Sequence, residues 1–369
     1  MKIIFYLGSM TKGGAERVIS NISDFLTKKG YEIYIITTVA GKSMYKLNDR
    51  VIHLTLDKEN EKINGRIKRN QVRIKRLDEY IKEIKPDVIL SLLPEPTFKL
   101  MHLRNKIKVP IIISDRNDPK VEYANPIYYY FMKKYYKKAD GFIFQTEEAQ
   151  KYFKKRIQNN SVVIPNPINE KFVNLPAINE KQKEKTVINV GRLTSQKNQK
   201  VLIDAFEIVH KQHNDYILKI FGEGELKEEL QKQIDEKHMN GYVKLMGETE
   251  NIVEELQKSM MFVLSSDYEG MPNALMEAMA VGLPVISTDC PCGGPRYLIK
   301  NNDNGILVQV NNKDEMVKAI CKIIEDENFA KNIGKNAKKI VDDVNPVKIF
   351  EMWENYINEI VKKYNSKFF

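Results

Sequence analysis

The sequence predicts an α/β fold built from two doubly wound parallel sheets. Short apolar runs alternate with longer stretches of helical periodicity along the chain, a pattern typical of parallel strands joined by crossover helices. The alternation stops at Pro165-Asn166-Pro167 and a polar linker that reaches Lys185, and then it starts again. A chain of 369 residues is also too long for one ordinary core. We therefore expect two domains, residues 1–167 and 168–346.

The expected strands are the short apolar runs. In the first domain they are Lys2–Leu7, Glu32–Thr38, Val51–Leu56, Asp87–Leu92, Pro110–Ser114, Gly141–Gln145 and Val162–Ile164. In the second domain they are Thr186–Val190, Tyr216–Phe221, Val243–Met246, Met261–Leu264, Pro284–Ser287 and Gly305–Val308. Helices fill the chain from about Lys313 onward, and the last one carries apolar residues at helical spacing, namely Ile349, Met352, Trp353, Tyr356, Ile357 and Ile360. Ligands of such sheets bind at the carboxyl ends of the strands, so the loops there are the candidate sites.

The segment Asp267–Ala280 carries the strongest signal in one of these loops. Glu269 lies in a turn with Gly270, and Glu277 lies in an almost wholly apolar helix, where a carboxylate is costly to bury without hydrogen bonds. Pro272 suits the first turn of this helix, whose opening N–H groups attract anions such as phosphate. The alternatives are a buried salt bridge for Glu277 and simple solvent exposure for Glu269.

Arg192 and Lys197 stand five positions apart on the loop that leaves the first expected strand of the second domain. Two cations at one point would neutralise a diphosphate and stabilise the charge that grows on it as it leaves. In this lysine-rich chain the alternative is a pair of surface charges. No D-x-D pattern occurs, so the usual carboxylate clamp for a divalent cation is missing, and we expect neither a metal nor a cofactor.

Two glycine-rich turns also follow expected strands. Gly13 and Gly14 come after the first strand, and Gly222 and Gly224 come after the second strand of the second domain. Glycine allows backbone N–H groups to approach an anion closely. Many strand-to-helix turns nevertheless contain glycine only to reverse the chain, so each turn alone is a weak indication.

Together these segments resemble the retaining glycosyltransferases of family 4. Asp267–Ala280 contains their E-x7-E pattern, and Gly13-Gly14-Ala15-Glu16-Arg17 is similar to their early glycine loop. Gly191-Arg192-Leu193-Thr194-Ser195-Gln196-Lys197-Asn198 is similar to their basic loop, and Gly222-Glu223-Gly224-Glu225-Leu226 to their glycine turn. The resemblance implies the GT-B fold, in which two Rossmann-like domains face each other across a cleft. It also implies that the C-terminal helix, about residues 347–369, crosses back to the first domain instead of capping the second.

The resemblance implies a role for each matched residue. The first domain would bind the acceptor, and the second would bind a nucleotide-sugar donor. Glu277 would accept hydrogen bonds from the ribose, Glu269 would contact the donor sugar, and Arg192 and Lys197 would bind the diphosphate, so that Arg192, Lys197 and Glu269 carry the catalysis. Further donor contacts are implied for Gly13, Gly14, Gly222, Gly224, Gly270, Met271, Pro272, Asn273, Ala274 and Leu275.

The sequence departs from the family after the strand Pro110–Ser114. Many relatives resemble Ser-Glu-His there, with the histidine on the donor sugar, whereas this chain has Ser114-Asp115-Arg116. Arginine does not shuttle protons near neutral pH, so Asp115 and Arg116 are expected to contact the donor sugar or the acceptor by binding charge or hydroxyl groups. This stretch and Cys290–Arg296 are similar to bacterial capsule and exopolysaccharide transferases. Cys290–Arg296 is also similar to the GalNAc-transferring enzyme of bacterial N-glycan assembly.

The charge of the chain is unevenly distributed. The net charge is +10, and the excess of Lys and Arg lies in the first 165 residues, while the rest is slightly acidic. Lys62–Arg76 is strongly basic, and Tyr128–Lys138 mixes aromatic residues with lysine, a combination that suits an anionic membrane surface. The alternative for each stretch is an ordinary solvated helix. No nucleic-acid recognition motif is present, and no window is apolar enough to span a membrane. The cysteines are an odd, sparse set of three, which fits a reducing compartment.

The expected function is a retaining, metal-independent transfer of a hexose or N-acetylhexosamine. The donor would be a nucleotide-diphosphate sugar, UDP-linked by subgroup resemblance (UDP-GalNAc or UDP-GlcNAc), and the acceptor a polyprenyl-linked or growing surface glycan of a bacterium. We expect a cytoplasmic protein, peripheral on the inner face of the cell membrane. The alternatives are a sugar-nucleotide epimerase or phosphorylase of the same fold, and a non-catalytic protein that binds sugar nucleotides.

Overall fold

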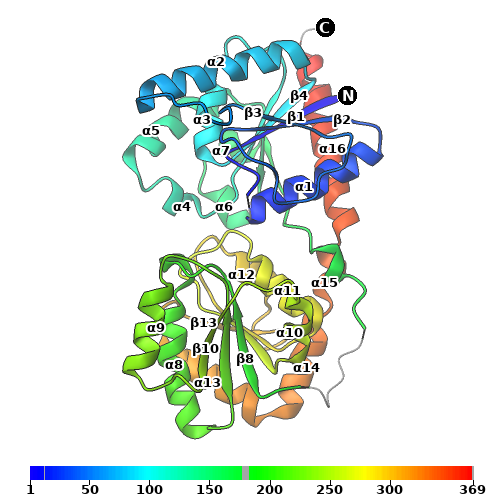
Figure 1. Ribbon diagram of the computed structural model, residues 1–369. Helices are drawn as coiled ribbons and strands as arrows, with labels where there is room; N and C mark the ends of the chain where they lie inside the picture. Colours follow the sequence, from blue (N-terminus) through cyan, green and yellow to red (C-terminus); the bar gives the residue numbers. More distant parts are fainter. Residues whose placement is uncertain (12, 177–182, 368–369) are drawn as a thin grey trace. The chain divides into compact units, whose positions relative to one another are not determined.

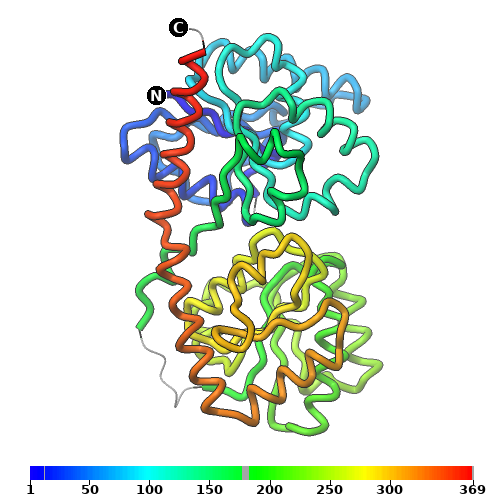
Figure 2. The backbone as a smooth tube through the Cα atoms, turned by 180° about the vertical axis from the view of Figure 1, so that it is seen from behind, coloured from blue at the N-terminus to red at the C-terminus, as the bar shows by residue number. Residues whose placement is uncertain are grey.

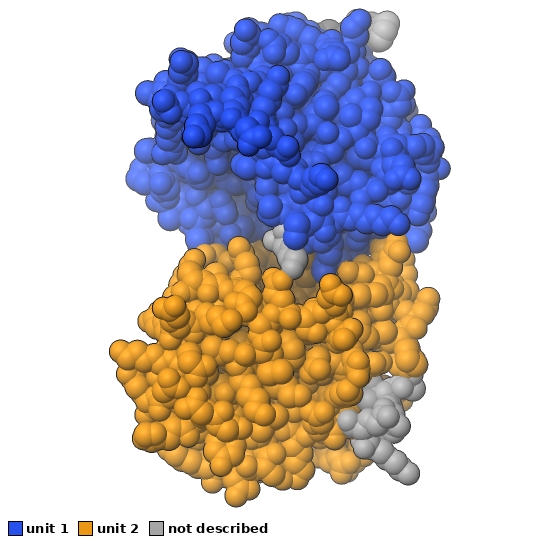
Figure 3. Space-filling view, viewed as in Figure 1, with its two compact units in different colours: residues 1–167, 347–369 blue, residues 168–346 orange. Residues whose placement is uncertain are grey.

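The computed structural model describes residues 1–11, 13–176 and 183–367, and these form two compact units. One unit contains residues 1–167 and 347–369, and the other contains residues 168–346, coloured separately in Figure 3. Part of the expected linker, residues 177–182, lies outside the described residues. Each unit has its own parallel sheet, so the predicted fold class is confirmed.

The first unit is built around a 7-stranded sheet with the order β3-β2-β1-β4-β5-β6-β7. Figure 1 labels several of its elements. Its elements are β1 Lys2–Leu7, α1 Gly14–Lys28, β2 Glu32–Thr37, β3 Ile52–Thr55, α2 Arg66–Ile84, β4 Val88–Leu92, α3 Pro94–His102, β5 Ile111–Ser114, α4 Pro119–Glu122, α5 Pro126–Tyr135, η1 Tyr136–Lys138, β6 Gly141–Phe144, α6 Glu147–Lys151, α7 Lys155–Gln158 and β7 Ser161–Val163. Strands β2 and β3 are added on one side of β1, and β4 to β7 are added on its other side. The topological switch therefore lies between β1 and β4, next to the Gly13-Gly14 turn.

The second unit repeats this plan with a 6-stranded sheet in the order β10-β9-β8-β11-β12-β13. Its elements are η2 Glu170–Phe172, β8 Thr186–Val190, η4 Ser195–Lys197, α8 Gln199–Gln212, β9 Ile217–Phe221, α9 Lys227–Glu236, β10 Val243–Gly247, α10 Ile252–Lys258, β11 Met261–Leu264, α11 Asn273–Val281, β12 Val285–Thr288, α12 Gly294–Leu298, β13 Ile306–Val308, α13 Lys313–Glu325, α14 Glu327–Ala337 and α15 Ile340–Asp343. The topological switch lies between β8 and β11. The basic loop follows β8, and the E-x7-E segment follows β11.

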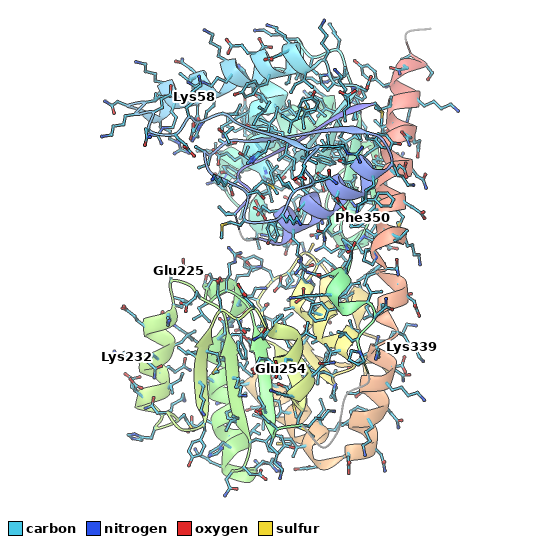
Figure 4. The ribbon with its side chains drawn as sticks, turned by 45° about the vertical axis from the view of Figure 1, so that its right-hand side comes forward. Lys58, Glu225, Lys232, Glu254, Lys339 and Phe350 are labelled. Carbon is cyan, nitrogen blue, oxygen red and sulfur yellow. The ribbon has the colours of Figure 1, made fainter. Side chains whose placement is uncertain are left out.

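The C-terminal helix α16, Pro346–Asn365, packs on the first unit, as the resemblance implied. Its apolar face joins the core that contains β1, and the Trp353 side chain is fully buried there. The tube in Figure 2 shows α16 running alongside this unit. The ring of Phe350, which Figure 4 labels, lies 5.4 Å from that of Phe25 on α1. Lys29 pairs with Glu354. The core of the first unit therefore combines the two ends of the sequence.

Candidate functional site

In the second unit, the carboxyl ends of β8, β9, β11 and β12 bring four of the predicted segments together. The basic loop follows β8, the glycine turn follows β9, the E-x7-E segment follows β11, and the Cys290–Arg296 segment follows β12. Because the strands are parallel and neighbouring, their loops lie at one edge of the sheet. The hydrogen bonds and close contacts described next join these loops to one another.

Lys197 and Glu269 contact each other directly. The Lys197 Nζ atom forms an ion pair with Glu269 Oε1, and the exposed fractions of the two side chains are only 16% and 7%. The Ser266 hydroxyl donates a second hydrogen bond of 2.7 Å to the same carboxylate oxygen. An ion pair this shielded from water is weakly screened, so removing either partner leaves a poorly compensated charge.

The loop that holds Lys197 is fastened to the turn that holds Glu269 by hydrogen bonds along the backbone. The Asp267 N–H donates to the Gln196 carbonyl at 2.9 Å, and the Gln196 side-chain amide donates to the Tyr268 carbonyl at 2.9 Å. The Ser265 hydroxyl donates to the Lys197 carbonyl at 2.8 Å. These bonds fix the position of the basic loop against the E-x7-E segment independently of the ion pair.

Arg192 is placed differently from Lys197 on the same loop. Its side chain is exposed, and within the described ranges the guanidinium has no hydrogen-bond or ion-pair partner. A guanidinium offers five N–H donors, and here no protein carboxylate uses them. The loop therefore presents one cation already paired with Glu269 and one that is available to an incoming anion.

The Gly222-Gly224 turn packs against the backbone of the basic loop. Gly222 has a φ of +137°, and a Cβ atom there would overlap the Gly191 carbonyl oxygen. A Cβ atom on Gly224 would overlap the Leu193 carbonyl oxygen, which also accepts a 3.0 Å hydrogen bond from the Leu226 N–H. Glycine is thus required here by backbone proximity, which positions the loop of Arg192 and Lys197.

Helix α11 begins one residue later than expected, with Pro272 at the N-cap instead of in the first turn. Its first helical hydrogen bond runs from the Met276 N–H to the Pro272 carbonyl at 3.2 Å. Glu277 is 7% exposed within this helix, which agrees with the expectation of a buried carboxylate. The other predicted donor contacts lie just before the helix or in its first turn, namely Gly270, Met271, Asn273, Ala274 and Leu275.

The Cys290–Arg296 segment packs against the same turn. A Cβ atom on Gly294 would overlap the Gly270 carbonyl oxygen, so glycine permits the contact between α12 and the residue after Glu269. Burial raises the pKa of the Cys290 thiol, with a smaller contribution from the charge of Glu269. The thiol therefore stays protonated near neutral pH and acts as a small apolar group beside the site.

In the first unit, the glycine loop is closed by a residue that no sequence motif indicated. The Tyr45 hydroxyl accepts a 3.0 Å hydrogen bond from the Gly13 N–H and donates a 2.8 Å bond to the Gly13 carbonyl. Helix α1 starts at Gly14, directly after it. The Gly13 N–H is thus satisfied within the protein, and the expected contact with an anion would have to replace Tyr45 or use the following N–H groups.

Asp115 lies in a buried cluster of hydroxyl groups. Both of its carboxylate oxygens accept hydrogen bonds from the Tyr123 hydroxyl, at 3.1 and 3.0 Å, and one also accepts a 2.9 Å bond from the Tyr136 hydroxyl. Burial raises the pKa of Asp115 to about 7, against the opposing effect of the two tyrosine hydrogen bonds. The carboxylate is therefore occupied by protein groups, and it holds the loop that carries Arg116.

Arg116 also points into the first unit. One Nη atom donates to the Asn166 side-chain oxygen, and the guanidinium carbon lies 5.7 Å from the centre of the Trp353 ring. Its Nε atom and its other Nη atom are buried without a partner among the described residues, and burial lowers the pKa of the guanidinium to about 10. Arg116 thus connects the end of β5 to the Pro165–Pro167 stretch and to α16.

Among the described residues, one group combines side chains that can bind a metal: His213, Cys321 and Glu325. The His213 Nε2 atom lies 3.2 Å from a Glu325 oxygen. His213 follows the end of α8, and the other two residues lie on α13, so the group is at the amino-terminal edge of the sheet, opposite Arg192 and Lys197. It is therefore separate from the candidate site.

Comparison with known proteins identifies both halves of the chain. Residues 12–172 match the model of "Glycosyltransferase Family 4", and residues 171–340 match the model of "Glycosyl transferases group 1". An N-acetylgalactosaminyltransferase of Campylobacter jejuni, whose name specifies a GalNAc-containing diphospho-undecaprenol substrate, is 28% identical over 98% of this chain and 99% of its own length. The amylovoran biosynthesis glycosyltransferase of Erwinia amylovora is 25% identical over 96% of this chain and 99% of its own.

Solved structures share the fold. The sucrose-phosphate synthase of Thermosynechococcus elongatus superposes with a TM-score of 0.83 at 17% sequence identity, covering 98% of this chain and 100% of that one. Within the described part of the chain, none of the helices combines the length and the apolar content that a membrane crossing requires. With a family 4 domain followed by a group 1 domain and GT-B neighbours along its length, the chain belongs to the GT-B glycosyltransferases.

Proposed function

We propose that this protein is a retaining, metal-independent glycosyltransferase that uses a UDP-linked N-acetylhexosamine or hexose. The second unit binds the donor, with Arg192 and Lys197 on the diphosphate, Glu269 on the sugar and Glu277 on the ribose. The first unit binds the acceptor. The observation that supports this most directly is the Lys197–Glu269 ion pair at the carboxyl edge of the sheet. Lys197 is on the same loop as the exposed Arg192, whose guanidinium has no partner among the described residues.

Binding of the donor changes the interactions of Lys197 and Glu269. A diphosphate that approaches Arg192 brings negative charge next to Lys197, which then shares its positive charge between the phosphate and Glu269. Glu269 is left able to accept hydrogen bonds from sugar hydroxyls, while Ser266 keeps the carboxylate in place. Ligand binding thus replaces a protein ion pair by a charge-assisted network that contains the substrate.

The chemistry requires no protein nucleophile. The bond between the anomeric carbon and the diphosphate oxygen breaks, and the acceptor hydroxyl oxygen attacks from the same face. Its proton passes to the departing phosphate oxygen. Arg192 and Lys197 stabilise the negative charge that develops on the leaving diphosphate, a type of interaction worth roughly 3–4 kcal/mol of barrier per donor in other enzymes. Positioning of the two substrates supplies the remainder.

The proposed acceptor is a glycan on a polyprenyl diphosphate. The Campylobacter relative, similar along nearly its whole length, is named for transfer of N-acetylgalactosamine to a glycan on diphospho-undecaprenol. Such a substrate is held in a membrane, so the transferase must work at its surface. We therefore place the protein on the inner face of the cell membrane, where nucleotide-sugars are available.

The first unit has features suited to an anionic membrane surface. Ile67 on α2 is 77% exposed, and Ile127 and Tyr130 on α5 are 63% and 60% exposed. Lys133 and Lys134 lie over tyrosine rings of α5. Apolar and aromatic side chains beside lysine are typical of interfacial helices. Within Lys62–Arg76, however, Arg73 and Arg76 pair with nearby carboxylates, so only part of that stretch is available to lipid.

A donor and acceptor assay tests the proposal. Purified protein is incubated with UDP-GalNAc, UDP-GlcNAc, UDP-glucose or UDP-galactose and a polyprenyl-diphosphate glycan, in EDTA. The expected result is release of UDP and extension of the glycan with retained anomeric configuration. Donor alone is the control, because epimerisation without acceptor would identify the protein as an epimerase. Inverted product, or strict dependence on added Mg²⁺, would refute the proposed mechanism.

A further inference from the structure

A pocket lined by cations lies in the first unit. It has a volume of about 220 Å³. Its lining includes Ala139 and Asp140 just before β6 and Asn160 just before β7, so it lies at the amino-terminal edge of the sheet. The Gly13-Gly14 turn follows the carboxyl end of β1 in the same parallel sheet. The pocket is therefore distinct from the proposed substrate contacts.

Four positively charged side chains surround this pocket. They come from three separate parts of the chain: Lys137 and Lys138 from η1, Arg156 from α7, and Lys367 from just beyond α16. The buried rings of Tyr136 and Phe142, whose centres are 5.7 Å apart, also line the pocket. Because the cations come from separate elements, the fold brings them together around one hollow.

None of these four cations makes an ion pair or a side-chain hydrogen bond within residues 1–11, 13–176 and 183–367. Among the described residues of the lining the one carboxylate is Asp140, and it is already used, since it accepts a 3.0 Å bond from Arg104 and a 2.9 Å bond from the Ile111 N–H. Elsewhere in the chain lysines commonly pair with a carboxylate one helical turn away, as Lys151 does with Glu147. Within the part of the chain that the structure describes, the pocket thus keeps an uncompensated positive charge.

Like charges around one hollow repel each other, and an anion with several oxygens removes that repulsion. A phosphate group fits the requirement, because its oxygens can accept from the arginine fork and from several ammonium groups at once. The pocket is smaller than the roughly 300–1,000 Å³ of sites for drug-sized ligands, so it suits a phosphate group and not an oligosaccharide. We propose that Lys137, Lys138, Arg156 and Lys367 form a phosphate-binding site.

Two sources can supply that phosphate. The pocket continues the aromatic and lysine-rich segment Tyr128–Lys138, so an anionic phospholipid headgroup could enter it at a membrane surface. A small soluble phosphate ester offers the same chemistry. The inference does not depend on the proposed transferase activity, because the pocket shares no residue with the candidate donor site.

The test compares two double variants of the full chain. Arg156→Gln with Lys367→Gln removes two charges from the pocket. Lys244→Gln with Lys318→Gln removes two exposed lysines of the second unit that pair with no described residue, and serves as the charge-matched control. All four side chains are exposed, so both variants should fold, and circular dichroism verifies this. Binding of glycerol 3-phosphate is measured by titration calorimetry, and binding to phosphatidylglycerol vesicles by flotation, with phosphatidylcholine vesicles as the uncharged comparison.

We expect the pocket variant to bind glycerol 3-phosphate about tenfold or more weakly than wild type, and the control variant to bind as wild type does. A parallel loss of flotation on phosphatidylglycerol would identify the headgroup as the source, and retained flotation would identify a soluble ester. Arg156→Lys with Lys367→Arg, which keeps both charges, should restore binding. Equal affinity in the pocket variant and wild type, or an equal loss in both double variants, would overturn the proposal.

Discussion

At the scale of single residues, the loop after β8 holds two cations in different surroundings. Lys197 is shielded and paired with Glu269, whereas Arg192 is exposed and unpaired within the described residues. If both serve the diphosphate, both are needed for turnover. Only Lys197 should also matter for folding, because only its loss leaves a buried carboxylate without its partner.

Arg192→Ala should therefore lower turnover by about 100-fold or more and leave the melting temperature nearly unchanged. Lys197→Ala should lower turnover similarly and also destabilise the protein by about 3 kcal/mol. Initial rates and thermal unfolding of the same preparations give both values. The account would be wrong if Arg192→Ala kept wild-type turnover, or if Lys197→Ala were as stable as wild type.

The buried carboxyl group of Asp115 should make the stability of the fold depend on pH. Its pKa in the folded protein is about 7 against an ordinary value of 3.8, because burial outweighs its tyrosine hydrogen bonds. Between these values the folded state holds more protons than the unfolded state, so this residue contributes less stability as the pH rises through that window. Asparagine does not titrate. Asp115→Asn should thus gain stability relative to wild type by up to about 1.4 kcal/mol per pH unit.

Melting temperatures of wild type and Asp115→Asn at pH 5 and pH 8 measure this effect, since subtraction removes the titration of all other groups. The melting temperature of Asp115→Asn relative to that of wild type should be higher at pH 8 than at pH 5. A difference that stays constant between the two pH values would show that Asp115 is ionised throughout.

At this scale the burial of Glu277 was predictable from the sequence, whereas several side-chain contacts were not. Lys197, Glu269 and Glu277 carry a spacing pattern, and the structure buries both carboxylates. The contact of Tyr45 with Gly13, and those of Tyr123 and Tyr136 with Asp115, had no signal in the sequence. They join positions up to 32 residues apart through hydroxyl groups, and no local pattern encodes such a bond.

At the scale of elements, the site depends on loops that touch through their backbones. The turn after β9 and the loop after β8 approach so closely that Gly224 has no room for a side chain. The displacement of either loop should move Arg192 and Lys197 away from the E-x7-E segment, because hydrogen bonds connect all three.

Gly224→Ala should accordingly weaken donor binding by about tenfold or more, without any change in a charged group. Gly241→Ala is the matched control in the same unit, since a Cβ atom at Gly241 meets nothing within 4 Å. Titration calorimetry with the nucleotide-sugar compares the two variants. Equal affinities would show that the glycine turn has no role in positioning the basic loop.

The elements themselves were largely predictable. Every expected strand is present within about one residue at each end, because parallel strands are continuous apolar runs bounded by polar turns. The start of α11 was misplaced by one residue, since proline is compatible both with the N-cap and with the first turn. The packing of α16 on the first unit followed from family resemblance, because its periodicity alone fits either unit.

At the scale of the whole molecule, the two units differ in charge in a way that matches their proposed tasks. The first carries the positive excess and exposed apolar side chains on α2 and α5, which suits an anionic membrane and a diphosphate-linked acceptor. The second is slightly acidic overall and concentrates Arg192 and Lys197 at one edge of its sheet. Basicity near the proposed donor site is thus local, as expected for a site that must bind and then release a nucleotide diphosphate.

The most direct measurement is nucleotide binding in the presence of EDTA. UDP, GDP, ADP and TDP are titrated into wild type and Arg192→Ala by calorimetry. We expect UDP to bind wild type without metal and to bind the variant about tenfold or more weakly. Binding that appears only with Mg²⁺, or equal affinity in the two proteins, would contradict a diphosphate site built from protein cations.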